Sequence, residues 1–294
     1  MSKIIEALER ARQDGTLDPM VEAVDERGTL APVSLRDRAP RVAAPREVGD
    51  VRKLLDDVAL DPAVLRDIDP FLVTLHQPMS VVAEQYRALR NRIERLSRQD
   101  GLQVLGITSS VKGEGKSLTA TNLAAVMAQG AAKRVLLVDA DLRRPKIDKL
   151  IAVHRSPGLA DYLQGEAEWD DLFQHTPYYG LDVVGAGETR GHPSDLLAGP
   201  AMQEFIAQCR RQYDYIIFDT PPLLPISDVN FLVELLDGVA LVVRANKTGR
   251  GLLKQAADSL PEGKILGTLL NRAQSMRQGY GYGYGKGGYY SKYY

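Results

Sequence analysis

Five short apolar runs, separated by segments long enough for helices, constrain the fold of this chain more than any other feature. Each run is rich in Val, Ile or Leu, as strands buried on both faces of a sheet are. The segments between them are long enough for crossover helices, which predicts an α/β fold with a doubly wound, mainly parallel sheet. The five predicted strands are Val104–Thr108, Val135–Val138, Tyr215–Phe218, Val239–Val243 and Ile265–Leu270.

A glycine-rich loop follows the first apolar run. Residues 109–117 read Ser-Ser-Val-Lys-Gly-Glu-Gly-Lys-Ser and precede a helical stretch, 118–128. Strand, glycine loop and helix together form the context of a P-loop, whose backbone N–H groups surround a phosphate. The motif predicts a P-loop NTPase sheet that binds Mg-ATP, although Ser110 stands where the consensus has its first glycine. The predicted nucleotide-binding residues are Lys112, Gly113, Glu114, Gly115, Lys116, Ser117 and Leu118.

Carboxylates follow two of the predicted strands. Asp139 and Asp141 come after the second run, and Asp219 ends the third. Open α/β sheets bind ligands at this edge, so we expect Ser117, Asp139 and Asp219 to hold Mg²⁺. An aspartate at the end of a strand is also a common helix N-cap, and this alternative stays open, above all for Asp141. The predicted catalytic residues are Lys116, Asp139, Asp141 and Asp219.

The last residues have an unusual composition. Seven of the thirteen tyrosines fall in the final fifteen residues, on a glycine-rich segment with little that could enter a core. Exposed phenols beside an ATP site predict phosphorylation of this tail, while a sticky low-complexity segment or a tail that orders on a partner are alternatives. The predicted phosphoacceptors are Tyr280, Tyr282, Tyr284, Tyr289, Tyr290, Tyr293 and Tyr294.

Transfer to tyrosine requires a base. A phenol with a pKa of about 10 is roughly 0.1% ionised at neutral pH. A neighbouring carboxylate would therefore help to remove its proton. Asp139 and Asp141 are both candidates for this base, and we favour Asp139.

These residues resemble a known family, the bacterial tyrosine kinases (BY-kinases) of the CpsD/CapB type. The resemblance rests on the P-loop without its first glycine, on Asp-x-Asp-x-Arg at 139–143 and on Asp-Thr-Pro-Pro at 219–222. It covers about residues 71–294. Asn271 resembles the asparagine that contacts adenine in related ATPases. The N-terminal region is similar to the tyrosine autokinases encoded with exosortase-linked polysaccharide systems.

The resemblance implies a non-specific protein-tyrosine kinase that phosphorylates its own tail between subunits and regulates exopolysaccharide or capsule synthesis or export. It also implies a ring-shaped homo-oligomer, with Glu84, Arg87 and Arg90 at the subunit contact. Further partners that it implies are a membrane polysaccharide co-polymerase (chain-length determinant) as activator and a cognate tyrosine phosphatase.

Two other functions compete with the kinase. The first is a positioning ATPase of the ParA/MinD type, which shares the fold but carries an extra lysine five residues before the P-loop lysine. Val111 holds that position here, and Lys112 is one place off. The second is a nucleotide-binding scaffold without kinase activity, which the presence of a full set of Mg²⁺ ligands disfavours.

Composition and segment boundaries complete the expectations. We expect an N-terminal helix (3–13) and a largely disordered linker up to residue 70, a kinase domain at 71–275 and a disordered tail at 276–294. A net charge of −1 argues against nucleic acid as a partner, and the single Cys209 fits a reducing cytoplasm. No apolar stretch approaches the length of a membrane helix, so we expect a cytoplasmic protein that meets the inner membrane through its partner.

Overall fold

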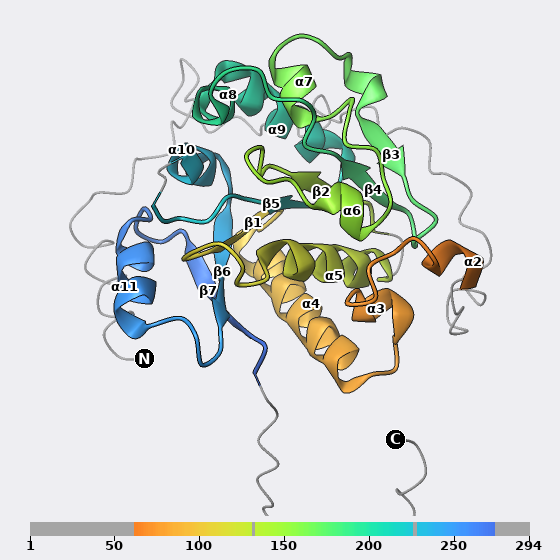
Figure 1. Cartoon of the computed structure of the whole chain (residues 1–294), viewed down its shortest axis with the longest axis vertical. Helices are drawn as coiled ribbons and strands as arrows, with labels where there is room; N and C mark the ends of the chain where they lie inside the picture. Colours follow the sequence, from red (N-terminus) through yellow and green to blue (C-terminus); the bar gives the residue numbers. More distant parts are fainter. Residues whose placement is uncertain (1–61, 131–132, 226–227, 274–294) are drawn as a thin grey trace, which may run out of the picture. The chain divides into compact units, whose positions relative to one another are not determined.

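The sheet at the centre of the molecule has seven strands in the order β3-β4-β2-β5-β1-β6-β7 (Figure 1). The structure is a computed structural model that describes residues 62–130, 133–225 and 228–273. The predicted helix at 3–13 and the tyrosine-rich tail lie outside these residues. The strands are β1 (Val104–Ser109), β2 (Val135–Asp139), β3 (Phe173–His175), β4 (Leu181–Val184), β5 (Tyr215–Asp219), β6 (Gly238–Arg244) and β7 (Ile265–Asn271).

The five predicted strands are confirmed as β1, β2, β5, β6 and β7, and all of them are parallel to their neighbours. The predicted fold class is also confirmed. Two strands were not predicted. β4 adds to β2 in parallel, and β3 pairs antiparallel with β4 at the edge of the sheet.

Helices cover both faces of the sheet. The face with α4 and α5 buries Leu105 of β1, whereas the opposite face, with α9 and α10, buries the neighbouring Val104. This alternation makes both sides of β1 part of a core, as the apolar sequence of the run predicts. The helices are α2 (Pro62–Leu65), α3 (Val73–His76), α4 (Val81–Asp100), α5 (Lys116–Ala128), α6 (Ile147–Leu150), α7 (Leu159–Leu163), the 3₁₀ helix η3 (Trp169–Asp171), α8 (Pro193–Ala198), α9 (Pro200–Gln212), α10 (Asp228–Leu235) and α11 (Arg250–Asp258).

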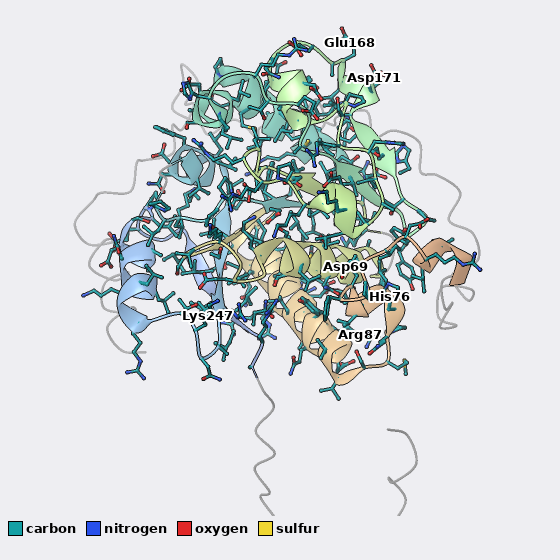
Figure 2. All side chains as sticks on the ribbon, viewed as in Figure 1. Asp69, His76, Arg87, Glu168, Asp171 and Lys247 are labelled. Atoms are coloured by element: carbon teal, nitrogen blue, oxygen red, sulfur yellow. The ribbon has the colours of Figure 1, made fainter. Side chains whose placement is uncertain are left out.

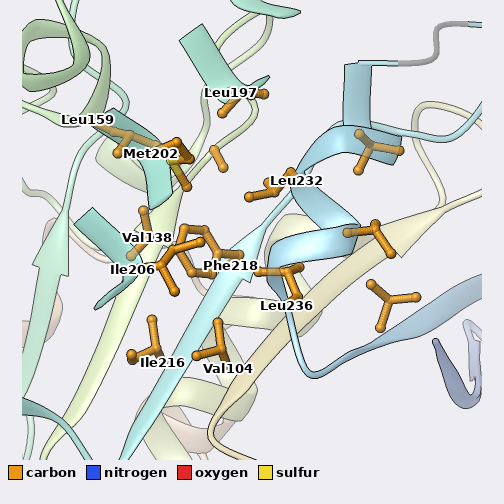
Figure 3. Close-up of a cluster of buried hydrophobic side chains, with 14 of the residues drawn as sticks. Val104, Val138, Leu159, Leu197, Met202, Ile206, Ile216, Phe218, Leu232 and Leu236 are labelled. Carbon is orange, nitrogen blue, oxygen red and sulfur yellow. The ribbon is translucent and has the colours of Figure 1, made fainter. Parts of the chain in front are cut away.

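The core on the α9 and α10 face fixes the strands that carry the predicted carboxylates. Phe218 of β5 lies at its centre and contacts the ring of Phe205 edge-on, with ring centroids 6.5 Å apart (Figure 3). Ile206 and Leu236 close the cluster from α9 and from the end of α10. Each fully buried side chain of this size stabilises the fold by about 1.5–3 kcal/mol. Asp219, the residue after Phe218, is therefore held on a rigid strand.

The described fold begins before Phe71, where we placed the domain boundary. Ile68 and Leu72 are buried in the core beneath α5. The side chain of Asn122 on α5 accepts hydrogen bonds from the backbone and the hydroxyl of Thr74, at 3.1 and 3.0 Å. The helix predicted from Ser80 to Ser97 is confirmed as α4, with the hydroxyl of Ser80 accepting the N-cap hydrogen bond at 3.1 Å.

Across the described ranges, no helix combines the length and the apolar character that a membrane span requires.

Candidate active site

The P-loop joins the end of β1 to the start of α5. Gly113 and Gly115 have φ values of +83° and +102°, which favour glycine, and Gly115 is the N-cap of α5. A Cβ on Gly115 would lie 2.0 Å from the side-chain nitrogen of Asn271. Backbone hydrogen bonds from Leu223 and Leu224 to Ser109 and Ser110 hold the start of the loop against the segment after β5. The loop therefore has the backbone of a phosphate-binding turn at a helix N-terminus.

Lys116 and two of the predicted aspartates meet in one buried cluster. The ammonium nitrogen of Lys116 lies 2.6 Å from Asp141 Oδ2 and 3.3 Å from Asp219 Oδ1. It also lies 3.3 Å from the hydroxyl of Ser117. Lys116 and Asp141 are only 7% and 4% exposed, and Asp219 is fully buried. The structure brings these side chains together, and their roles in a reaction stay predictions.

Burial and the neighbouring charges shift the pKa values of Lys116 and Asp219 in opposite directions. Burial disfavours the charge of Lys116, but Asp219 and Asp141 outweigh it and raise the pKa of the ammonium group. Burial also raises the pKa of Asp219, although the charge of Lys116 acts to lower it. Asp219 Oδ2 is buried and has no hydrogen-bond partner in the structure. A buried, unpartnered carboxylate oxygen beside a hydroxyl and a phosphate loop suits an ion such as Mg²⁺, which prefers oxygen ligands.

The described residues contain no group of three or more His, Cys, Asp or Glu side chains arranged to hold a metal on their own. Mg²⁺ typically takes one or two protein carboxylates together with phosphate and water oxygens. Ser117, Asp219 and Asp139, which lies opposite Asp219 on β2, stay the predicted ligands beside the P-loop.

Asp139 lies directly opposite Asp219 on the paired strands β2 and β5. Its carboxylate accepts hydrogen bonds from the backbone N–H groups of Lys146 at 2.9 Å, Ile147 at 3.0 Å and Asp141 at 3.2 Å. A carboxylate can accept about four hydrogen bonds, so one acceptor position remains. Burial and the charge of Asp219 raise the pKa of Asp139 to about 7, near the value that suits a general base at neutral pH.

The raised pKa of Asp139 predicts a pH-dependent stability in the absence of nucleotide and Mg²⁺. Because the folded protein holds this proton more tightly than the unfolded chain, the stability from Asp139 is complete below pH 4 and is lost as the pH rises through 7. The loss is on the order of a few kcal/mol, at about 1.4 kcal/mol for each unit of pKa difference. Asp139→Asn should flatten this dependence in urea unfolding series at pH 5, 6, 7 and 8.

Asp170→Asn is the matched control for that series, because Asp170 is exposed in η3 and its loss should leave the pH dependence of unfolding unchanged. Equal pH dependence in the wild type and Asp139→Asn would show that Asp139 does not bind a proton on folding.

Glu114 connects the P-loop to two other segments. Its carboxylate is 2% exposed, accepts the backbone N–H of Val111 at 3.2 Å and forms a short hydrogen bond with the hydroxyl of Thr248. The side chain of Asn271, at the end of β7, donates to the Glu114 carbonyl at 2.8 Å. Glu114 and Asn271 therefore shape the loop in this structure. Thr248 was not among the predicted site residues, because it lies after β6 and far from the loop along the chain.

Removing the hydroxyl of Thr248 should weaken nucleotide binding. Thr248→Val leaves the buried carboxylate of Glu114 without this donor, at a cost of about 1.5–3 kcal/mol for a charged hydrogen bond. We expect the Kd for a non-hydrolysable Mg-ATP analogue to rise about tenfold or more, measured by calorimetry. Thr248→Ser keeps the hydroxyl and should stay within about twofold of the wild type. Equal affinity of the Val and Ser variants would contradict a positioning role for Thr248.

The other predicted nucleotide-binding residues lie at the tip of the P-loop or on α5, and the predicted subunit-contact residues lie on α4. Lys112 and Gly113 are exposed at the tip of the P-loop, and Leu118 is half-buried on α5. Arg87 contacts Glu84 at 2.8 Å on α4 and donates to the Pro78 carbonyl, on the side of the molecule near α3 (Figure 2).

Arg90 of α4 is half-buried, as Arg87 is, and contacts α5. Its guanidinium donates to the Val126 carbonyl at the end of α5, at 3.1 Å. A cation is favourable at the C-terminus of a helix, so Arg90 has a contact within the monomer.

Comparison with known proteins agrees with this site. A family model described as an AAA domain matches residues 103–248, which include the P-loop and all three aspartates. The tyrosine-protein kinase YwqD of Bacillus subtilis is 36% identical over 202 residues, which cover 68% of this chain and 85% of YwqD. The succinoglycan biosynthesis transport protein ExoP of Rhizobium meliloti is 33% identical over 70% of this chain, but the match spans only 27% of ExoP.

Solved structures of tyrosine kinase domains are also similar to this chain. The kinase domain of the Escherichia coli tyrosine kinase ETK superposes with a TM-score of 0.66 and 30% sequence identity. The similarity covers 74% of this chain and 86% of that kinase domain. The fold, the P-loop cluster and a relative matched over most of its length lead to one assignment. This chain belongs to the family of bacterial tyrosine-protein kinases.

Proposed function

We propose that this protein binds Mg-ATP at the P-loop and transfers the terminal phosphate to tyrosines of its own C-terminal tail. The observation that carries the proposal is that every tyrosine outside the tail is buried or half-buried. Tyr178, Tyr213 and Tyr215 are less than 8% exposed. The other three, Tyr86, Tyr162 and Tyr179, are half-buried. The phenols of the folded domain are thus poor acceptors, whereas the tail holds seven tyrosines.

Desolvation further lowers the reactivity of the tyrosines in the folded domain as phosphate acceptors. Burial raises the pKa of Tyr86, Tyr162 and Tyr178 above the usual value. Burial, reinforced by the charge of Asp182, raises the pKa of Tyr213 further. A higher pKa makes the nucleophilic phenolate rarer. The tail tyrosines are therefore the better nucleophiles.

The buried cluster supplies the groups for the reaction. When bound, Mg²⁺ would supply positive charge to the phosphates, with Ser117, Asp219 and Asp139 as its proposed ligands. Lys116 would leave part of its contact with Asp141 and Asp219 to bind the β- and γ-phosphates, and the loop amides would stabilise the transferring group. Asp139 or Asp141 would accept the phenol proton. We favour Asp139 for this role.

Transfer between subunits remains part of the proposal. Glu84 is exposed on α4, and Met79 and Val81 beside it are 77% and 72% exposed. An exposed apolar patch with an ion pair at its border is suited to self-association, in line with the expected ring contact at Glu84, Arg87 and Arg90. Asn271 is proposed as the adenine contact, since it lies against the P-loop.

The proposed biological role is control of exopolysaccharide or capsule synthesis or export. ExoP, a polysaccharide transport protein by name, carries the region similar to this chain as about a quarter of its length. This supports a polysaccharide co-polymerase as the activating membrane partner, and a cognate tyrosine phosphatase would reverse the modification. We further propose the exosortase-linked autokinase subgroup, a cytoplasmic location at the inner membrane, and a segment order of linker, kinase domain and tail.

One labelling experiment tests the kinase function. The purified chain is incubated with γ-labelled ATP and Mg²⁺, alone and with the cytoplasmic segment of a co-polymerase, and the label is mapped by peptide. Label on the tail tyrosines supports the proposal. Free phosphate without labelled protein would favour a positioning ATPase, and bound nucleotide without turnover in both conditions would favour a scaffold.

A further inference from the structure

The last strand of the sheet, β7, has a free edge in the described part of the chain. Within those residues it pairs only with β6. Leu270 and Ile265 are 65% and 37% exposed, and no residue of β7 is fully buried. The outward N–H and C=O groups of such an edge can pair with a further strand. Long apolar edges of this kind are usually covered or blunted, and β7 has neither proline nor charge.

An open apolar groove runs beside this edge. It has a volume of about 410 Å³ and lies between α4 and β7. A Cβ added to Gly267 would meet no atom within 4 Å, so the space above this part of β7 is open. Arg92 is the one charged side chain of the lining. The apolar side chains that line the groove include Leu89, Ile93, Leu96, Leu266 and Leu269.

The segment that follows β7 has the sequence pattern of a strand. β7 ends at Asn271, and residues 279–285 read Gly-Tyr-Gly-Tyr-Gly-Tyr-Gly. Side chains alternate between the two faces of a strand, so Tyr280, Tyr282 and Tyr284 would all lie on one face. The seven residues between Asn271 and Gly279 are enough for a turn that brings this segment back along β7.

We propose that the unphosphorylated segment 279–285 docks on the free edge of β7 as an antiparallel strand, with its tyrosines in the groove beside α4. Residues directly opposite each other in an antiparallel pair share a face. If Tyr282 lies opposite Leu269, then Tyr284 lies opposite Gly267, where the open space can receive its ring. Aromatic rings each bury about 150–250 Å² in such sites, and the glycines on the other face avoid any clash.

Docking would withhold three phosphoacceptors from the active site until they are released. This consequence rests on the proposed kinase function, whereas the docking itself does not. A phosphate adds a charge of about −1.5 to −2, which is costly to bring against leucine side chains, and one arginine cannot balance three phosphates. Phosphorylation of these tyrosines should therefore prevent the tail from returning to β7.

Hydrogen exchange tests the docking without any catalysis. Dephosphorylated protein is studied without ATP, as the full chain and as a chain ending at Ser275. We expect amides of residues 265–271 to exchange at least about fivefold more slowly in the full chain, because the outward N–H groups gain partners. Exchange at the same rate in both proteins would refute the proposal. Slowing that appears only at high protein concentration would identify the tail of a second copy as the occupant, and would refute docking within one chain.

Two sets of variants make the test specific. Replacing Tyr280, Tyr282 and Tyr284 together by Ser should remove the slow exchange, and replacing them by Phe should keep it, because ring packing and not the hydroxyl holds the segment. Leu96→Glu places a charge in the groove and should also remove the slow exchange of residues 265–271. Asn91→Glu adds the same side chain on α4 outside the groove lining and should have no effect. Equal exchange for the Ser and Phe variants would also contradict the assignment.

A peptide experiment separates this proposal from the kinase function. A labelled synthetic peptide of residues 277–287 should bind the chain that ends at Ser275, and its triply phosphorylated form should bind at least about tenfold more weakly in fluorescence anisotropy. Binding that phosphorylation leaves unchanged or strengthens would contradict the release step. The result does not depend on whether the protein phosphorylates tyrosine.

Discussion

Replacing Lys116 by Met is expected to lower phosphate transfer to the tail by about a hundredfold to a thousandfold or more. Loss of a single charge-stabilising donor in an active site has effects of this size. Lys116 lies in the P-loop with its ammonium group held 2.6 Å from Asp141 and 3.3 Å from Asp219, where solvent cannot replace it. The rate is measured as label transferred from γ-labelled ATP to protein in the presence of Mg²⁺.

Lys254→Met is the matched control, because it removes the same charge from an exposed position on α11 and should leave the rate unchanged. Circular dichroism should also show that the Lys116→Met protein is folded, since this substitution leaves Asp141 and Asp219 without their cation. Burial already raises the pKa of Asp219, so this carboxylate can take up a proton in response, which limits the loss of stability. A folded Lys116→Met protein with normal transfer would contradict the role given to this lysine.

Replacing all seven tail tyrosines by Phe is expected to remove at least nine tenths of the label incorporated by the wild type. The remaining tyrosines are buried or half-buried in the domain, so they are poorer acceptors than exposed phenols. Phe keeps the ring and removes only the hydroxyl that accepts phosphate. Incorporation is measured by mass spectrometry of tail peptides and by total bound label.

Transfer to an added tyrosine-containing peptide should persist in this variant, because the P-loop and the aspartates are unchanged. Tyr179→Phe is the control within the domain and should incorporate label as the wild type does. Full labelling of the variant without tail tyrosines would show that the acceptors lie elsewhere and would overturn the proposed substrate.

The apolar runs predicted five of the strands because each is a stretch rich in Val, Ile or Leu that no charged residue interrupts. The prediction that all five are buried on both faces holds for β1, β2, β5 and β6, whereas β7 is exposed at the edge of the sheet. β3 and β4 escaped prediction for a physical reason. β3 has only three residues, and the apolar residues of β4 are interrupted by Asp182, which binds His175 and Tyr213. Such short strands take their structure from neighbouring strands, and their own sequence carries little of that information.

One part of the candidate site could likewise be predicted from the sequence, and another part could not. The convergence of Lys116, Asp141 and Asp219 could be predicted, since each follows a buried strand whose carboxyl end lies at one edge of the sheet. The contact between Glu114 and Thr248 could not be predicted. It joins residues 134 positions apart, and nothing in the local sequence marks either side chain as its partner. The engagement of Asp139 by Lys146 and Ile147 depends in the same way on how the chain turns after β2.

The position of β1 at the centre of the sheet sets an order of events during synthesis. Val104 pairs with Ile216, and Leu105 pairs with Gly238, so both neighbours of β1 leave the ribosome long after β1 itself. Until β5 and β6 have been synthesised, the apolar residues of β1 have no neighbouring strand to pair with. The P-loop also lacks the contact between Lys116 and Asp219. Such distant pairings are slow to form and leave sticky segments exposed in the meantime. The nascent chain should therefore keep β1 exposed until β5 and β6 have emerged, and the nucleotide site is complete only after Thr248 and Asn271 have followed.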